Sequence, residues 1–136
     1  MTPEEMAVLH SACFTVPRPW SAAEFKTLQN DPTVILLSET DALIAVRVSG
    51  PEAEVLTICT HPEARQQGRA RELLHKAERA AQAKGVEEVF LEVADTNSSA
   101  RALYAAMGYV PIGKRKNYYR APRGERVTAV VLKKSL

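Results

Sequence analysis

Residues 91–109 read LEVADTNSSARALYAAMGY, and this stretch decides the fold of the central part of the chain. Residues 89–93 form an apolar run of the length expected for a mostly buried strand. Turn and capping residues follow at 95–99, and they open a helix that ends at Gly108. A further strand is predicted over about residues 109–114. The order strand, helix, strand implies a parallel crossover connection.

Upstream, residues 57–71 read TICTHPEARQQGRAR and join a predicted strand to the longest helix through the pattern R-x-x-G-x-A. The small residues Gly68 and Ala70 allow several backbone N–H groups to point outward at the positive end of a helix, which suits a pyrophosphate. By itself the pattern also fits an ordinary turn, and it is neither a P-loop nor the Rossmann fingerprint. Apolar residues then recur at helical spacing until Lys84 and Gly85.

Together, R-x-x-G-x-A and the pattern L-E-V-x-x-x-N-x-x-A-x-x-L-Y-x-x-x-G-Y, which begins at Leu91, resemble the GNAT superfamily of N-acetyltransferases. Within it, the sequence is most similar to the ribosomal-protein-alanine N-acetyltransferases of bacteria. Further matches are PWS at 19–21 and RKNYY at 115–119, so the resemblance spans nearly the whole chain. It implies one N-acetyltransferase domain over residues 1–136. The implied α/β fold has about four helices and a mixed, mostly antiparallel sheet of about seven strands, with a V-shaped opening between the third strand and the next.

The resemblance implies direct transfer of an acetyl group from acetyl-CoA, as co-substrate, to an amine, without a metal. Glu92 matches the position of the general base in this superfamily, and Tyr104 matches the position of the general acid that protonates the leaving thiolate. The strand end at 58–60 and the turn after it match the segments that bind the cofactor in this superfamily. The implied cofactor-binding residues are Ile58, Cys59, Thr60, Arg65, Gln66, Gln67, Gly68, Arg69, Ala70, Arg71 and Asn97.

The residues alone leave other interpretations open at these positions. Asn97 is equally typical of a simple helix N-cap. Glu92 fits a solvent-facing strand residue, and Tyr104 fits an aromatic residue packed on a helix. The chemistry favours the functional interpretation, because an α-amine has a pKa of roughly 7.7 to 8.0 and needs only a modest base at neutral pH.

The first half of the chain contains two capping boxes and three β-branched runs. Residues 2–5 (TPEE) and 21–24 (SAAE) each predict the start of a helix, and a loop from Thr15 to Trp20 separates the two helices. Strands are predicted at 34–38, 42–48 and 54–60, in the pattern of an antiparallel meander. Near the C-terminus we expect a basic loop from Arg115 to Arg126 and a last strand from Val127 to Lys133.

Length and composition point to one ordinary globular domain. The chain has 136 residues, of which 46% are hydrophobic and 25% charged. It contains no apolar stretch of the roughly 18 residues that a membrane helix needs, and its acidic N-terminus does not resemble a signal peptide. We therefore expect a cytoplasmic protein without a membrane partner. Residues 1–60 hold 3 basic and 8 acidic side chains, whereas residues 61–136 hold 15 basic and 8 acidic ones.

Cysteine and histidine spacing gives no metal-site signal. Cys13 and Cys59 lie far apart without a CxxC pair, which favours two reduced thiols. His10, His61 and His75 have no carboxylate or cysteine at ligand spacing, which favours surface or packing roles. Direct transfer needs no nucleophilic cysteine, so Cys59 is expected to contribute its backbone.

The acceptor is less clearly specified than the donor. By resemblance it is a protein N-terminus, namely the N-terminal alanine of a small-subunit ribosomal protein. The same core would also support acetylation of a small amine or a lysine side chain. A third interpretation is a non-catalytic module that holds coenzyme A or binds RNA through the basic loop, although no RNA-binding motif is recognised. Thr128 stands where relatives often carry an acidic residue, and the oligomeric state stays open.

Overall fold

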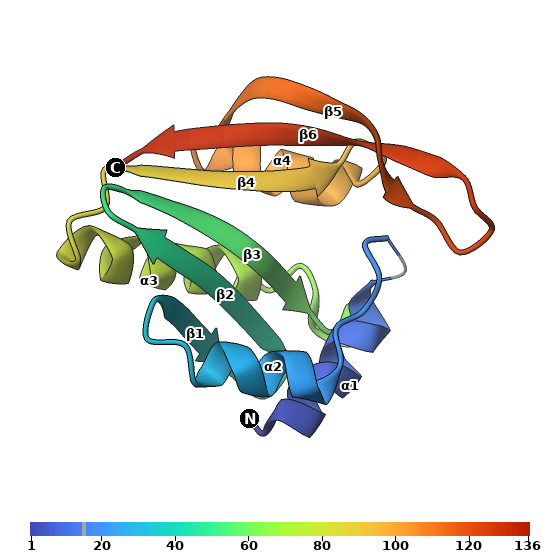
Figure 1. Ribbon diagram of the computed structural model, residues 1–136, viewed down its shortest axis with the longest axis horizontal. Coiled ribbons are helices and arrows are strands. Elements are labelled where there is room, and N and C mark those ends of the chain that lie inside the picture. Colours follow the sequence, from blue (N-terminus) through green and yellow to red (C-terminus); the bar gives the residue numbers. More distant parts are fainter. Residues whose placement is uncertain (15) are drawn as a thin grey trace.

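The computed structural model describes residues 1–14 and 16–136, and in it a mixed β-sheet is covered by helices on both faces. Helices α1 (Pro3–Cys13) and α2 (Ala22–Gln29) lie on one face, and α3 (Arg69–Ala83) and α4 (Ser98–Ala106) lie on the other (Figure 1). Alternate residues of the sheet enter two separate cores. Ile44 packs in the core with α3 and α4, whereas Leu43 packs in the core with α1 and α2.

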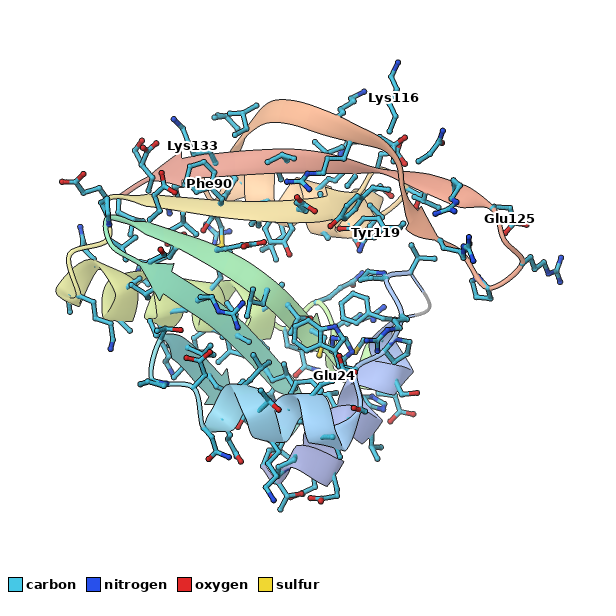
Figure 2. The ribbon with its side chains drawn as sticks, in the orientation of Figure 1. Glu24, Phe90, Lys116, Tyr119, Glu125 and Lys133 are labelled. Carbon is cyan, nitrogen blue, oxygen red and sulfur yellow. The ribbon has the colours of Figure 1, made fainter. Side chains whose placement is uncertain are left out.

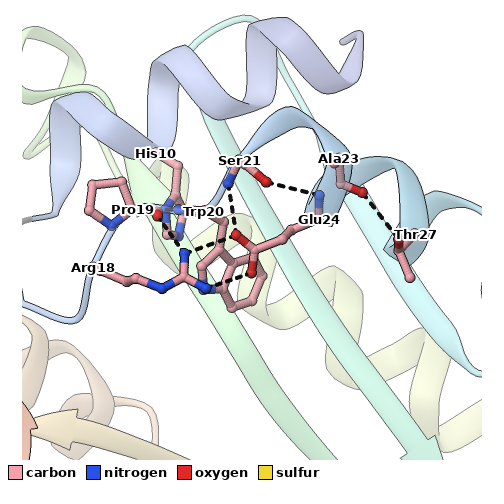
Figure 3. Close-up of polar contacts among 8 residues, drawn as sticks. All are labelled: His10, Arg18, Pro19, Trp20, Ser21, Ala23, Glu24 and Thr27. Atoms are coloured by element: carbon pink, nitrogen blue, oxygen red, sulfur yellow. Dashed lines mark hydrogen bonds and ion pairs between the residues drawn. The ribbon is translucent and has the colours of Figure 1, made fainter.

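Both predicted capping boxes form. The side chain of Thr2 accepts from the Glu5 N–H, and the Glu5 side chain accepts from the Thr2 N–H in return. In the same way, the Ser21 side chain accepts from the Glu24 N–H and the Glu24 side chain accepts from the Ser21 N–H (Figure 3). These contacts satisfy N–H groups that have no partner inside the helices. The two N-terminal helices are therefore confirmed. Thr15, where the predicted connecting loop begins, lies outside the described residues.

Over residues 1–14 and 16–136 the sheet has six strands, in the order β1-β2-β3-β4-β6-β5, which is slightly fewer than the expected number of about seven. The antiparallel meander is confirmed, with strands β1 (Val34–Ser38), β2 (Ala42–Ser49) and β3 (Glu52–Thr60). A short 3-10 helix (Pro62–Ala64) follows, and α3 then leads to β4 (Glu88–Ala94), which pairs with β3 in parallel.

The C-terminal hairpin differs from the expectation. Most of the stretch from Arg115 to Arg126 is strand rather than loop, because β5 (Val110–Arg120) runs to Arg120 and β6 (Arg126–Ser135) begins at Arg126. Only residues 121–125 form the connecting loop. Almost every residue of β5 is exposed, so the stretch lacks the apolar alternation by which a strand is recognised. As predicted for the crossover through α4, β5 runs in the same direction as β4. The antiparallel strand β6 lies between them.

The two central strands part halfway along their length. β3 and β4 pair only between residues 52–55 and 88–91. Immediately afterwards, at Leu56, a β-bulge interrupts the pairing of β3 with β2, since Val55 pairs with Val46 and Thr57 pairs with Ala45. A bulge bends its strand and increases the local twist, so β3 turns away from β4 (Figure 1). The predicted V-shaped opening is therefore present.

Across the described residues, none of the helices has the length and apolar character needed to span a lipid bilayer.

Candidate active site

A cavity of about 700 Å³ occupies the opening between β3 and β4. It is lined by β3, the turn before α3, the end of β4, one side of α4 and Tyr119 of β5. All but one of the site residues predicted from the sequence line it; the exception, Gln67, is exposed and does not. Those that do are Ile58, Cys59, Thr60, Arg65, Gln66, Gly68, Arg69, Ala70, Arg71, Glu92, Asn97 and Tyr104. Two distant segments of sequence thus share one cavity.

The turn before α3 has the geometry of an anion site. Gln66 and Gly68 both adopt positive φ, at 65° and 76°. The first backbone hydrogen bond at the start of α3 runs from the Glu72 N–H to the Gly68 carbonyl. The N–H groups of Arg69, Ala70 and Arg71 precede it and have no acceptor inside the helix, so they can bind an anion at the helix end.

The arginines of this turn have different surroundings. Arg69 lines the cavity, yet its guanidinium lies 3.2 Å from Asp41 and 3.5 Å from Glu39, both next to the β1–β2 turn. Arg65 donates from Nε to the Thr60 carbonyl at 3.1 Å and so ties the turn to the end of β3. The charge of Arg69 is therefore largely neutralised by the neighbouring turn.

The end of β3 presents a free edge to the cavity. From Leu56 to Thr60 this strand pairs only with β2, because its pairing with β4 stops at Val55. The hydroxyl of Thr60 is buried without a hydrogen-bond partner among the described residues. Unpaired strand groups and a buried hydroxyl are suited to the amides and carbonyls of an extended ligand, as in β-strand addition. This wall of the cavity therefore suits an extended ligand that carries amides, with an anionic group at the turn before α3.

Glu92 lies on β4 at the far wall of the cavity. Its side chain is 19% exposed, and Oε1 lies 2.9 Å from Nε of Arg115. Burial raises the pKa of the Glu92 carboxyl above its ordinary value; Arg115 opposes this shift, and the nearby Glu54 adds to it. A carboxylate with a raised pKa is a better proton acceptor than an exposed one.

Tyr104 lies on α4 and is 5% exposed. Its ring packs edge-on against that of Tyr109, with the centroids 5.9 Å apart. Burial, with a smaller effect from Tyr119, raises the pKa of Tyr104 well above its ordinary value. The phenol therefore stays protonated and can serve as a hydrogen-bond donor.

Tyr119 is a cavity residue that the sequence analysis did not assign to the site. In β5 the register shifts between Arg115 and Tyr119, so that residues 116–118 lie opposite Thr128 alone. Asn117, at φ 53°, turns the strand there, and its N–H donates to the Thr128 hydroxyl at 3.4 Å. Burial and Glu92 raise the pKa of Tyr119 to about 12. Figure 2 shows Tyr119 next to the end of β4, well away from the hairpin tip at Glu125. The RKNYY match at 115–119 contains Tyr119 and is the sequence signal that could have found it.

Asn97 is the N-cap of α4, which is one of the two interpretations that the sequence allowed. Its side chain accepts from the Ala100 N–H at 3.2 Å, at the first turn of α4. Because Asn97 also lines the cavity, the cap does not remove it from the candidate site.

His10 is a buried packing residue, as expected. Nδ1 accepts from the Trp20 N–H at 3.0 Å (Figure 3). Nε2 therefore carries the proton and donates to the Thr57 hydroxyl at 2.8 Å. The ring stacks on Trp20 and is 1% exposed. Within the described part of the chain, no group of histidine, cysteine and carboxylate side chains could hold a metal ion.

Comparison with known proteins agrees with this geometry. The sequence profile of the acetyltransferase (GNAT) family matches residues 4–109. The ribosomal protein bS18-alanine N-acetyltransferase of Haemophilus ducreyi is 33% identical over 118 residues, which cover 84% of this chain and 81% of that protein.

Solved structures show the same fold. A ribosomal-protein-alanine N-acetyltransferase from Escherichia coli superposes with a TM-score of 0.83 at 25% identity, over 95% of this chain and 84% of that one. NAA60 of Arabidopsis thaliana, solved in complex with acetyl-CoA, gives a TM-score of 0.86 at 14% identity, over 99% and 93%. The predicted α/β fold class and the predicted family are confirmed.

Proposed function

This chain belongs to the acetyltransferase (GNAT) family, and on that premise we propose that it acetylates the N-terminal α-amine of a protein with acetyl-CoA as co-substrate. The observation that best supports this proposal is the shared cavity. It brings Glu92, Tyr104, the free edge of β3 and the turn at 65–71 together. A donor thioester and an acceptor amine can therefore meet beside a base and an acid.

Glu92 is the proposed general base. An α-amine with a pKa near 8 is largely protonated at neutral pH and must lose a proton before its lone pair can attack. The Glu92 carboxylate would take that proton, directly or through one water. The amine nitrogen then bonds to the thioester carbonyl carbon.

Tyr104 is the proposed general acid. When the carbon–sulfur bond breaks, the sulfur leaves with the electron pair as a thiolate. The Tyr104 O–H, kept protonated by burial, donates to this sulfur as charge develops. The nitrogen, now bonded to the acetyl carbon, gives up its second proton and becomes an amide, and Tyr104 regains a proton from solvent. The product thiol then leaves.

The cofactor contacts follow from the free backbone groups. The N–H groups at the start of α3 would bind the pyrophosphate. The edge of β3 at 58–60 would bind the pantetheine amides and polarise the acetyl carbonyl, where the negative charge of the tetrahedral intermediate develops. Arg65 would contribute charge beside the pyrophosphate, and Asn97 a polar group at the opposite wall.

The acceptor is proposed from similarity. The Haemophilus ducreyi relative carries the name of an enzyme that acts on the alanine of ribosomal protein bS18. We therefore propose the N-terminal alanine of a small-subunit ribosomal protein as the acceptor of this chain.

A thiol-release assay with acetyl-CoA tests both the acetyl transfer and the proposed acceptor. The acceptors are an alanine-initiated ribosomal peptide, the same peptide with a blocked N-terminus, a lysine peptide with a blocked N-terminus, and spermidine. We expect thiol release only with the free alanine terminus. Release with the lysine peptide or spermidine would move the acceptor class to side-chain or small amines. Coenzyme A binding without any transfer would indicate a non-catalytic module.

A further inference from the structure

The two cysteines lie together at the base of the cavity. Cys13 is the last residue of α1, and Cys59 precedes the last residue of β3. Both line the cavity, and both pack in the core between the sheet and the N-terminal helices. Cys13 is partly exposed, whereas Cys59 is 5% exposed. A solvent-accessible thiol thus lies beside a buried one.

Contacts bring the two cysteine side chains to the same place. Sγ of Cys13 donates to the Thr60 carbonyl at 3.2 Å, which places it against the residue that follows Cys59. The Cys13 and Cys59 side chains pack in the same core cluster. The guanidinium of Arg65 donates to the same Thr60 carbonyl. A thiolate at Cys13 would therefore lie near a cation and a second thiol.

These surroundings make the two thiols chemically unequal. The neighbouring Cys59 thiol, assisted by Arg65, lowers the pKa of Cys13 to about 7, although burial opposes this shift. The pKa of Cys59 is raised by its contact with Cys13 and by burial. A low-pKa accessible cysteine beside a second thiol is the arrangement found in peroxide-sensitive sites. The transfer reaction proposed above uses neither sulfur.

We propose that Cys13 and Cys59 form a modification site that hydrogen peroxide converts to an intramolecular disulfide. The Cys13 thiolate attacks one peroxide oxygen and the O–O bond breaks. The other oxygen leaves as hydroxide, takes a proton and becomes water, and Cys13 becomes a sulfenic acid. The Cys59 sulfur then bonds to the Cys13 sulfur, and the sulfenic oxygen leaves with the thiol proton as a second water. Two thiols lose two hydrogen atoms, and one peroxide becomes two waters.

The disulfide acts on the end of β3. An S–S bond of about 2.05 Å draws the last turn of α1 toward β3 and removes the thiol donor from the Thr60 carbonyl. Its effect on activity rests on the proposed function, because the 58–60 edge is where the acetyl carbonyl would be held. Misalignment at a reacting site slows transfer steeply, so the oxidised enzyme should lose about 10-fold or more of its transfer activity.

Intact mass measurement tests the modification without any need for activity. After the reduced chain is treated with hydrogen peroxide, we expect its mass to fall by two hydrogen atoms. Both cysteines should then resist alkylation until dithiothreitol is added. In Cys59→Ser, Cys13 should stop at the sulfenic acid and be trapped by dimedone. In Cys13→Ser, Cys59 should remain alkylatable after denaturation.

Activity gives the second readout. Cys13→Ser should keep its transfer activity in peroxide, whereas the wild type should lose activity and recover it with dithiothreitol. Two free thiols after peroxide treatment, or a disulfide that joins two chains on a non-reducing gel, would overturn the proposal. A disulfide that leaves transfer unchanged would overturn its effect on the site. If the disulfide forms in a chain without transferase activity, the thiol pair stands and the proposed function fails.

Discussion

Nε of Arg115 lies 2.9 Å from Oε1 of Glu92, so a cation of the C-terminal hairpin rests on a carboxylate of the central strand. The Arg115 guanidinium also lies 5.2 Å from the ring centre of Tyr118. This pair joins β5 to β4, although β6 separates the two strands in the sheet. The hairpin thereby influences the proton affinity of the proposed base.

Arg115→Gln should move the acidic limb of the pH profile of kcat/KM to higher pH. Arg115 opposes the raised pKa of Glu92, so removal of this cation raises the pKa further and the carboxylate forms only at higher pH. Lys116→Gln removes the same charge one residue away and serves as the control. An unchanged limb, or one that moves to lower pH, would show that Arg115 does not act on the base.

Glu92→Gln and Tyr104→Phe should each lower kcat/KM by about 10²-fold to 10⁴-fold, the usual contribution of a general base or acid. Steady-state kinetics with the alanine-initiated peptide measures this. Calorimetry should show coenzyme A binding close to wild type, since neither side chain is proposed to hold the pyrophosphate. Glu88→Gln, four residues earlier on the same strand, and Tyr118→Phe are the matched controls. Unchanged turnover in either active-site variant would remove that residue from the mechanism.

Gly68→Ala should weaken coenzyme A binding about 5-fold, since a non-glycine residue with positive φ costs about 1 kcal/mol. A Cβ at Gly68 meets no atom within 4 Å, so the effect comes from the backbone at φ 76° rather than from a clash. Gly68→Asn should bind better than Gly68→Ala, because asparagine tolerates this conformation. Gly50→Ala, at φ 59° in the β2–β3 turn, should leave binding unchanged. Equal binding by Gly68→Ala and wild type would contradict the pyrophosphate turn.

The stability of the protein should fall between pH 6.5 and pH 4 because of His10. Burial lowers the pKa of His10 from 6.5 to about 4, so in this window the unfolded chain binds a proton that the folded chain excludes. Stability therefore decreases as the pH falls, by about 2 kcal/mol at pH 5 and about 3 kcal/mol near pH 4.

Urea unfolding at several pH values measures this slope. His10→Gln removes the titrating group and should flatten the curve between pH 6.5 and pH 5. Parallel curves for the variant and the wild type would assign the acid sensitivity to other groups.

Local signals predicted most of the fold. The capping boxes at Thr2 and Ser21 marked the two N-terminal helices, because the side-chain and backbone partners lie within four residues of each other. Gly108 marked the end of α4 in the same way. The hairpin at 110–135 was predicted less well. The exposed, charged residues of β5 carry no apolar period, and their pairing with β6 depends on contacts that the local sequence does not encode.

The candidate site shows the same division. Glu92, Tyr104 and the turn around Gly68 belong to short patterns, and the structure places them around one cavity. Tyr119 was not assigned to it because its position depends on the bulge opposite Thr128. The contacts of Arg69 with Glu39 and Asp41 were also out of reach, since they join segments about 30 residues apart in the sequence.

Beyond the bulge at Leu56, β3 and β4 are no longer paired, so the hydrogen-bond ladder at the centre of the sheet is incomplete. Among the residues that the structure describes, only the four-residue pairing of β3 with β4 joins the two halves of the sheet through hydrogen bonds between neighbouring strands. A molecule that binds along the open edge of β3 would supply part of the missing ladder and bridge the halves. The contacts that bind the ligand then also hold the two halves of the sheet together. The protein with bound ligand therefore resists thermal unfolding more than the empty protein.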